Sequence, residues 1–150
     1  MVQQSIKCFP SLSLYHTVNS HGWVRLAPWN WDTDNNELSR PERLATGKIV
    51  SIKVSQPNVR SCNIRVDSKQ LSEIELENIK SIVKHWLSID WDPQPAILAA
   101  TTLDPRIALF INNGGGRFLR SSTFYEDFVK TICTINANWT STRRMISSIV

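Results

Sequence analysis

The sequence predicts an α+β fold in which an antiparallel β-sheet comes first and helices follow. Residues 48–55 and 60–67 alternate apolar and polar side chains, as strands with one solvated face do. From residue 72 onward, apolar side chains instead recur at steps of three and four, which indicates amphipathic helices. Strands that precede helices, rather than alternating with them, are typical of the α+β class.

Further strands are expected between Phe9 and residue 31. Leu12, Leu14 and His16 alternate with polar neighbours, residues 19–22 form a turn, and residues 23–28 resume an extended segment. Residues 56–58 contain a proline and are expected to end one strand before the next begins. Residues 32–36 are rich in Asp and Asn but lack the spacing of a calcium-binding loop, so we interpret them as a solvated hairpin loop.

Several helices are predicted after the sheet. Ser72 with Glu75, and Thr123 with Glu126, fit capping boxes that begin two of them. Short helices are expected at residues 94–102 and 104–113, the second of which has Asp104 as its N-cap. In the helix that follows Thr123, one apolar face is formed by Tyr125, Phe128, Val129, Ile132 and Ile135.

The last helix is expected to begin near Thr140 or Ser141, after an Asn-rich turn at residues 136–138. Its apolar pattern continues to Val150 without a C-cap, so we expect the chain to end inside a helical domain. The predicted organisation is a sheet with a packed helix over residues 1–103, and the beginning of a truncated helical domain over residues 104–150.

Composition restricts the function only loosely. A net charge of +4 and an isoelectric point near 9.2 permit an anionic partner without requiring one. Cys8, Cys62 and Cys133 lack the spacing of a disulfide framework or a zinc site, which favours free thiols in a reducing compartment. The sequence shows no signal peptide and no membrane-length apolar segment, so we expect a soluble intracellular protein. We expect no metal and no cofactor.

A run of glycines followed by Arg117 and Arg120 is a first candidate binding site. Backbone N–H groups and two guanidinium groups at such a turn suit a phosphate. The sequence is not a Walker A loop, because no Gly-Lys-Ser/Thr follows. The alternative is a helix stop whose arginines pair with carboxylates such as that of Asp104.

The turn at residues 136–140 is a second candidate. Asn136 and Asn138 can hydrogen-bond an unpaired base, Trp139 can wedge or stack, and Arg143 can hold a phosphate. The alternative is a turn between helices whose Trp139 packs inward, and local pattern alone favours it. The histidines do not cluster and no catalytic triad is visible, so we assign no catalytic residue.

Three segments resemble the 8-oxoguanine/3-methyladenine branch of the helix-hairpin-helix DNA glycosylases. Residues 132–138, Ile-Cys-Thr-Ile-Asn-Ala-Asn, resemble the family's "Ile-Cys-(Ser/Thr)-x-Asn-x-Asn" segment before its duplex-invading turn. Residues 115–120, Gly-Gly-Arg-Phe-Leu-Arg, are similar to the "Gly-x-Arg-(Leu/Phe)-Leu-Arg" turn just upstream. Residues 17–23 occupy the place of the family's "Ser-Gly-Gln" turn.

The resemblance implies base excision repair on double-stranded DNA, in which a damaged purine is flipped out and its N-glycosidic bond is cut. Asn136 and Asn138 would then fill the gap or contact the opposite base, with Trp139 near the wedge. His21 and Gly22 would lie at the lesion pocket. Two departures concern specificity: Ser141 stands where the cytosine-reading member has Arg, and the turn glycine is displaced to Gly22. Such a protein is expected in the cytoplasm or at the nucleoid.

The family's hairpin, its Schiff-base Lys and its catalytic Asp have no counterpart before Val150. The resemblance therefore implies the N-terminal part of a DNA glycosylase, without catalytic activity of its own. The alternatives are a non-catalytic DNA-binding or regulatory α+β domain, and a small intracellular α+β domain with an unrelated partner. The sequence gives no prediction of the oligomeric state.

Overall fold

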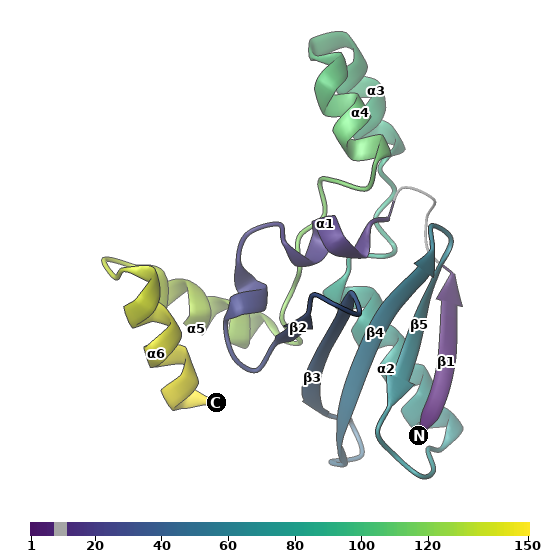
Figure 1. Cartoon of the computed structure of the whole chain (residues 1–150), viewed down its shortest axis with the longest axis vertical. Coiled ribbons are helices and arrows are strands. Elements are labelled where there is room, and N and C mark those ends of the chain that lie inside the picture. The colour runs from purple at the N-terminus through teal and green to yellow at the C-terminus, as the bar shows by residue number, and fades with distance from the viewer. Residues whose placement is uncertain (8–11) are drawn as a thin grey trace.

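The first half of the chain forms a five-stranded antiparallel sheet, in a computed structural model that describes residues 1–7 and 12–150. The strands lie in the order β1-β5-β4-β3-β2. Helices dominate the second half, which confirms the predicted α+β class (Figure 1). The strands are β1 (Val2–Lys7), β2 (Asn30–Asp32), β3 (Glu37–Arg43), β4 (Ile49–Asn58) and β5 (Ser61–Val66).

The two predicted alternating segments are the central strands β4 and β5. Val54 of β4 pairs with Ile64 of β5, and both side chains are buried, so the alternation does define the core-facing side. The expected break at residues 56–58 is wrong, because β4 continues through Pro57 to its end at Asn58. A shift in register between Ser55 and Asn58 accommodates the proline, as bulges commonly do.

The predicted strand near residues 12–16 is wrong. The structure has helix α1 (Leu14–Val18) there, and a 3₁₀ turn, η1 (Trp23–Arg25), further on. Ser13 caps α1 by accepting a hydrogen bond from the backbone N–H of His16 (3.2 Å), and Leu14, Thr17 and Val18 are buried at helical spacing. The expected start at Phe9, and the thiol of Cys8, lie outside the described residues.

Strand β1 was not expected, because its sequence is mostly polar. In the structure, five of its six residues are not buried. It pairs with β5 at the edge of the sheet, from Val2 opposite Val66 to Lys7 opposite Ser61. Only Ile6 of this strand reaches the core. Backbone pairing with a neighbour, rather than an apolar pattern, defines this strand.

Helix α2 (Glu73–Trp86) covers one face of the sheet (Figure 1). Its predicted capping box is confirmed: the Glu75 N–H donates to the Ser72 hydroxyl at 3.2 Å, and the Ser72 N–H donates to the Glu75 carboxylate at 2.9 Å. Ile79, Val83 and Trp86 pack with the inward side chains of the sheet to form the main core.

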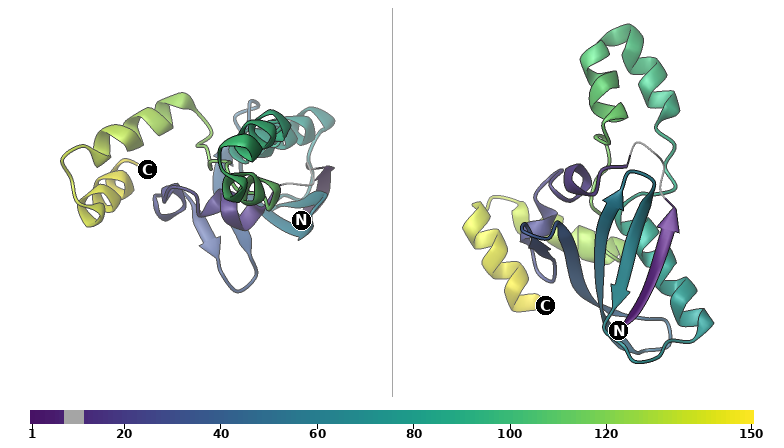
Figure 2. Two further views of the ribbon diagram at one scale, coloured as in Figure 1. Left: turned by 90° about the horizontal axis from the view of Figure 1, so that it is seen from above. Right: turned by 45° about the vertical axis from the view of Figure 1, so that its right-hand side comes forward.

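Helices α3 (Gln94–Leu103) and α4 (Pro105–Asn112) form a hairpin that projects from the body of the molecule (Figures 1 and 2). Asp104 caps α4 as predicted, accepting from the backbone N–H of Arg106 at 2.9 Å. The hairpin has its own small core of Ile97, Ala100, Ala108 and Ile111. The domain boundary at residue 103 stays a prediction.

Helices α5 (Phe124–Thr134) and α6 (Trp139–Ile149) lie on the opposite side of the molecule from β1 (Figures 1 and 2). They are joined by the predicted turn, in which Asn136 has a positive φ of 52°. Asn138 caps α6 by accepting from the N–H of Ser141 at 2.9 Å, so α6 begins at Trp139 rather than at Thr140 or Ser141.

The predicted apolar face of α5 points away from the sheet. Its members Tyr125, Phe128, Ile132 and Ile135 are exposed, while the one buried residue of this helix is Lys130, with 1% of its surface accessible. Helix α5 is therefore attached to the sheet through its polar side. Val129 is half-buried, and the rest of the apolar stripe remains exposed where an amphipathic helix ordinarily buries it.

Candidate functional site

A buried polar network attaches α5 to the sheet. Glu126 accepts two hydrogen bonds from the guanidinium of Arg40 on β3, both at 3.0 Å, and one from Lys130 at 2.6 Å. The guanidinium of Arg40 also stacks on Trp29, with 4.6 Å to the ring centroid. Because every charge has a partner of opposite sign, this network can hold α5 in place without a hydrophobic interface.

The same network explains a local departure from the predicted structure. The N–H of Glu126 donates to Thr123, as a capping box requires, but the Glu126 carboxylate binds Arg40 instead of returning to the backbone of Thr123. Burial alone would raise the pKa of Glu126, yet hydrogen bonds from Arg40 and Lys130 leave that pKa below its ordinary value. Burial lowers the pKa of Lys130, and Glu126 opposes this shift.

Asp127 connects α5 to η1. Its carboxylate accepts from the indole N–H of Trp23 at 2.6 Å and from the backbone N–H of Ser121 at 3.1 Å. Trp23 is therefore held in one orientation by a residue far along the chain. This contact fixes the position of residues 20–25 relative to α5 and the turn that follows it.

The turn at Gly22 and the start of α6 are in direct contact. Gly22 has a φ of +90°, and a Cβ added to it would lie 3.3 Å from the ring atoms of Trp139. Glycine is required here both for its backbone conformation and for this close approach. Beside the contact lies a cavity of about 340 Å³, lined by Asn19, His21, Gly22, Val24, Arg25 and Trp139.

His21 lies at the edge of this cavity between two aromatic rings. Its imidazole stacks on Trp23, with 4.7 Å between ring centroids, and forms a T-shaped pair with Phe118, with 5.4 Å between centroids. Its Nδ1 is 2.9 Å from the hydroxyl of Ser20. Burial lowers the pKa of His21, an effect that the charge of Asp127 partly opposes, so the neutral imidazole is favoured.

A second cavity of about 520 Å³ is lined in part by the same residues, Asn19, Val24 and Arg25. Arg143 of α6 is also at its wall. The remaining lining includes three aromatic residues, Tyr15, Trp29 and Trp31. The two cavities form one surface with flat rings and two exposed guanidinium groups, which we call the Trp139 surface.

The structure brings most of the predicted residues together at this surface. His21, Gly22, Trp139 and Arg143 line its two cavities. Trp139 rests on Gly22 and is still 37% exposed, so it combines the inward packing with the accessibility that were expected as alternatives. Asn136 and Asn138 are exposed at the adjoining turn.

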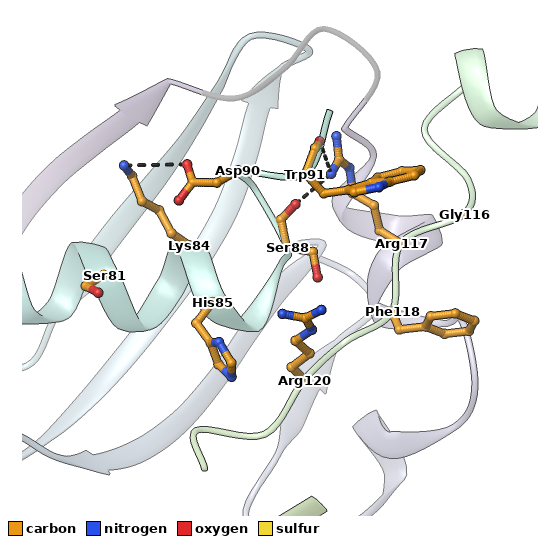
Figure 3. A pocket seen from close by; sticks show the side chains of 10 residues that line it. All are labelled: Ser81, Lys84, His85, Ser88, Asp90, Trp91, Gly116, Arg117, Phe118 and Arg120. Atoms are coloured by element: carbon orange, nitrogen blue, oxygen red, sulfur yellow. Dashed lines mark hydrogen bonds and ion pairs between the residues drawn. The ribbon is translucent and has the colours of Figure 1, made fainter. Parts of the chain in front are cut away.

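Arg117 and Arg120 lie elsewhere. Arg117 is only 3% exposed, and its Nη1 donates to the backbone carbonyls of Ser88 (2.6 Å) and Trp91 (2.9 Å). It therefore holds the loop after α2 in place. The expected pairing with Asp104 is not formed, since Asp104 binds Arg106. Arg120 is exposed in a separate hollow beside α2 (Figure 3).

The sequence did not predict Tyr15, Arg25 and Trp31 as parts of the site. They belong to the segment that was assigned to extended strands, and so they had no predicted place near α6. The one local indication was Ser13, a good N-cap, before Leu14 and Val18, which stand four residues apart as on one face of a short helix.

Within residues 1–7 and 12–150, no group of three or more His, Cys, Asp and Glu side chains could hold a metal ion. Over the same residues, no helix combines the length and apolar character needed to cross a membrane.

No protein-family model matches this sequence, and comparison with curated proteins finds no similar protein. Among solved structures, the fold is similar to that of a 3-methyladenine DNA glycosylase from Archaeoglobus fulgidus, with a TM-score of 0.76 at 14% sequence identity. The match covers 98% of this chain and 49% of that protein, so the chain spans about half its length. The fold is DNA-glycosylase-like.

Proposed function

We propose that this chain is the N-terminal part of a base-excision-repair DNA glycosylase and supplies its DNA-facing surface. The observation that carries the proposal is the contact between Trp139 and Gly22. It joins the two segments that a base-flipping protein needs side by side: a wedge for the duplex and a turn facing the flipped base. The similarity of fold to a DNA glycosylase supports the same assignment.

In this proposal each residue of the Trp139 surface has a distinct task. The half-exposed ring of Trp139 enters the base stack, and Asn136 and Asn138 hydrogen-bond the base left unpaired. The backbone of Gly22 and the neutral His21 imidazole form one side of the pocket for a damaged purine. Arg143, with Arg25 across the cavity, neutralises backbone phosphates.

Cleavage of the N-glycosidic bond is assigned to a part of the glycosylase outside this chain. The acidic residues of α5 are already engaged, Glu126 by Arg40 and Lys130, and Asp127 by Trp23 and Ser121. We propose that the catalytic half packs on the exposed apolar stripe of α5. Burying that stripe would stabilise the association through the hydrophobic effect.

A non-catalytic DNA-binding domain is the second candidate, favoured by the same engagement of the acidic residues. Both candidates predict duplex binding and no base excision by this chain alone. They differ when a helical half of a related glycosylase is added. Excision of alkylated purines restored by that mixture supports the first candidate, and continued inactivity under conditions of duplex binding supports the second.

We expect duplex binding to be weak and to depend strongly on salt, because the contacts assigned to Arg25 and Arg143 are to phosphates. Fluorescence anisotropy of a labelled duplex, measured at several NaCl concentrations from about 50 to 200 mM, gives the slope of log affinity against log salt concentration. Arg143→Gln should reduce that slope by about 0.9. Arg106→Gln on the projecting hairpin is the matched control and should leave it unchanged. Equal slopes in both variants would remove Arg143 from the interface.

A further inference from the structure

A hollow of about 500 Å³ lies between α2 and the segment that leads to α5 (Figure 3). One wall is the exposed side of α2 and its C-terminal turn, where Ser81, Lys84, His85 and Ser88 follow one another at helical spacing. The other wall is the segment 116–120, which the hydrogen bond from the Arg120 N–H to the Trp86 carbonyl (2.9 Å) fixes beside the helix.

The side chains in this hollow are mainly donors. The guanidinium of Arg120 points toward Ser88 beside His85 (Figure 3), and within the described residues it makes no hydrogen bond or ion pair. Lys84 stands at the far rim, 3.7 Å from Asp90, in a pair that is exposed on both sides. Asp90 is the one carboxylate among the lining residues that the structure describes.

The carbonyls at the end of helix α2 are already paired where they border this hollow. The carbonyls of a helix C-terminus carry partial negative charge, but those of His85 and Trp86 accept from the backbone N–H groups of Ser88 and Arg120. Arg117 donates to the carbonyls of Ser88 and Trp91 in the loop after α2 and stacks on the Trp91 ring, 4.9 Å from its centroid. A buried positive charge therefore lies beside the helix end, in the wall of the hollow.

We propose that this hollow is a binding site for a phosphate group. The planar fork of Arg120 matches two phosphate oxygens, and the His85 imidazole and Ser88 hydroxyl supply further donors. Two sources share this chemistry, a phosphate of a nucleic-acid backbone and a free phosphorylated compound. The site shares no lining residue with the Trp139 surface, although its Phe118 contacts His21 of that surface. The proposal does not depend on the function proposed for the Trp139 surface.

Titration of the ¹⁵N-labelled chain with inorganic phosphate at constant ionic strength tests the proposal. We expect saturable shifts in the amide signals of residues 84–91 and 116–120. Arg120→Gln should weaken binding about tenfold, the range of one charged hydrogen bond. Arg106→Gln is the control, because its guanidinium is exposed and pairs with Asp104 outside the hollow. A linear, unsaturated response, or equal affinity in the Arg120→Gln variant, would overturn the proposal.

A second titration identifies the source of the phosphate. Displacement of bound inorganic phosphate by a short DNA duplex assigns the hollow to backbone phosphate. Retention of phosphate while the duplex binds assigns it to a free phosphorylated compound. His85→Ala serves as a second variant: it removes a donor at the exposed surface of α2 without touching the core, and we expect weaker phosphate binding with an unchanged unfolding midpoint.

Discussion

Glu126→Ala should lower the free energy of unfolding by about 3–5 kcal/mol, the range measured when one partner of a buried ion pair is removed. The variant leaves Arg40 and Lys130 buried without their common carboxylate. It also removes the principal attachment of α5 to the sheet, since the helix turns its polar side inward. Urea denaturation followed by tryptophan fluorescence measures the loss.

Glu77→Ala provides the matched control for this prediction. Glu77 also pairs with a lysine on its own helix, Lys80 at 2.7 Å, but its side chain is 73% exposed. We expect a loss of no more than about 0.5 kcal/mol, because exposed ion pairs contribute little. Similar losses in the two variants would show that the network around Glu126 is not buried as described.

The network also predicts how stability depends on pH. The folded pKa of Glu126 lies below its ordinary value of 4.5, so its stabilising contribution is present above about pH 4.5 and is lost as the pH falls through the folded pKa. Lys130 acts differently: its folded pKa is also lowered, so its burial penalty is relieved as the pH rises toward 10.5. Glu126→Gln should therefore flatten the acid side of the stability profile. A profile as steep as that of the native chain would contradict this assignment.

Trp139→Ala should reduce duplex affinity about tenfold or more, since stacking of one base on an aromatic ring contributes about 1–3 kcal/mol. Trp139→Phe retains a ring and should recover part of the affinity. Leu98→Ala, an exposed apolar residue on the projecting hairpin, is the control and should bind as the native chain does. Equal affinities for Trp139→Ala and Leu98→Ala would exclude Trp139 from the interface. The unfolding midpoint of each variant confirms that it remains folded.

The elements predicted correctly from sequence are those whose determinants are local. The alternation in β4 and β5 and the capping box of Ser72 and Glu75 lie within short segments, and the structure contains each of them. The elements missed depend on distant partners. The N–H of Leu14 in α1 donates to the side chain of Gln56, which in turn donates to the carbonyl of Leu12.

The candidate site shows the same division. The Asn138 cap that begins α6 at Trp139 is encoded locally, although the start of this helix was expected one or two residues later. The inward-facing side of α5 does not follow from local sequence, because it is decided by Arg40 on β3, and an apolar stripe ordinarily indicates the buried side. Likewise, the burial of Arg117 depends on loop carbonyls that no local pattern specifies.

The comparison of two duplexes tests most directly whether the Trp139 surface is built to open DNA. One duplex is intact, and the other carries a single abasic site at its centre, where no base has to be unstacked or unpaired. Inserting a wedge into an intact stack costs a few kcal/mol, so we predict that the abasic duplex binds more tightly by about tenfold or more. This preference should disappear in Trp139→Ala. Equal affinity of the native chain for the two duplexes would contradict the account.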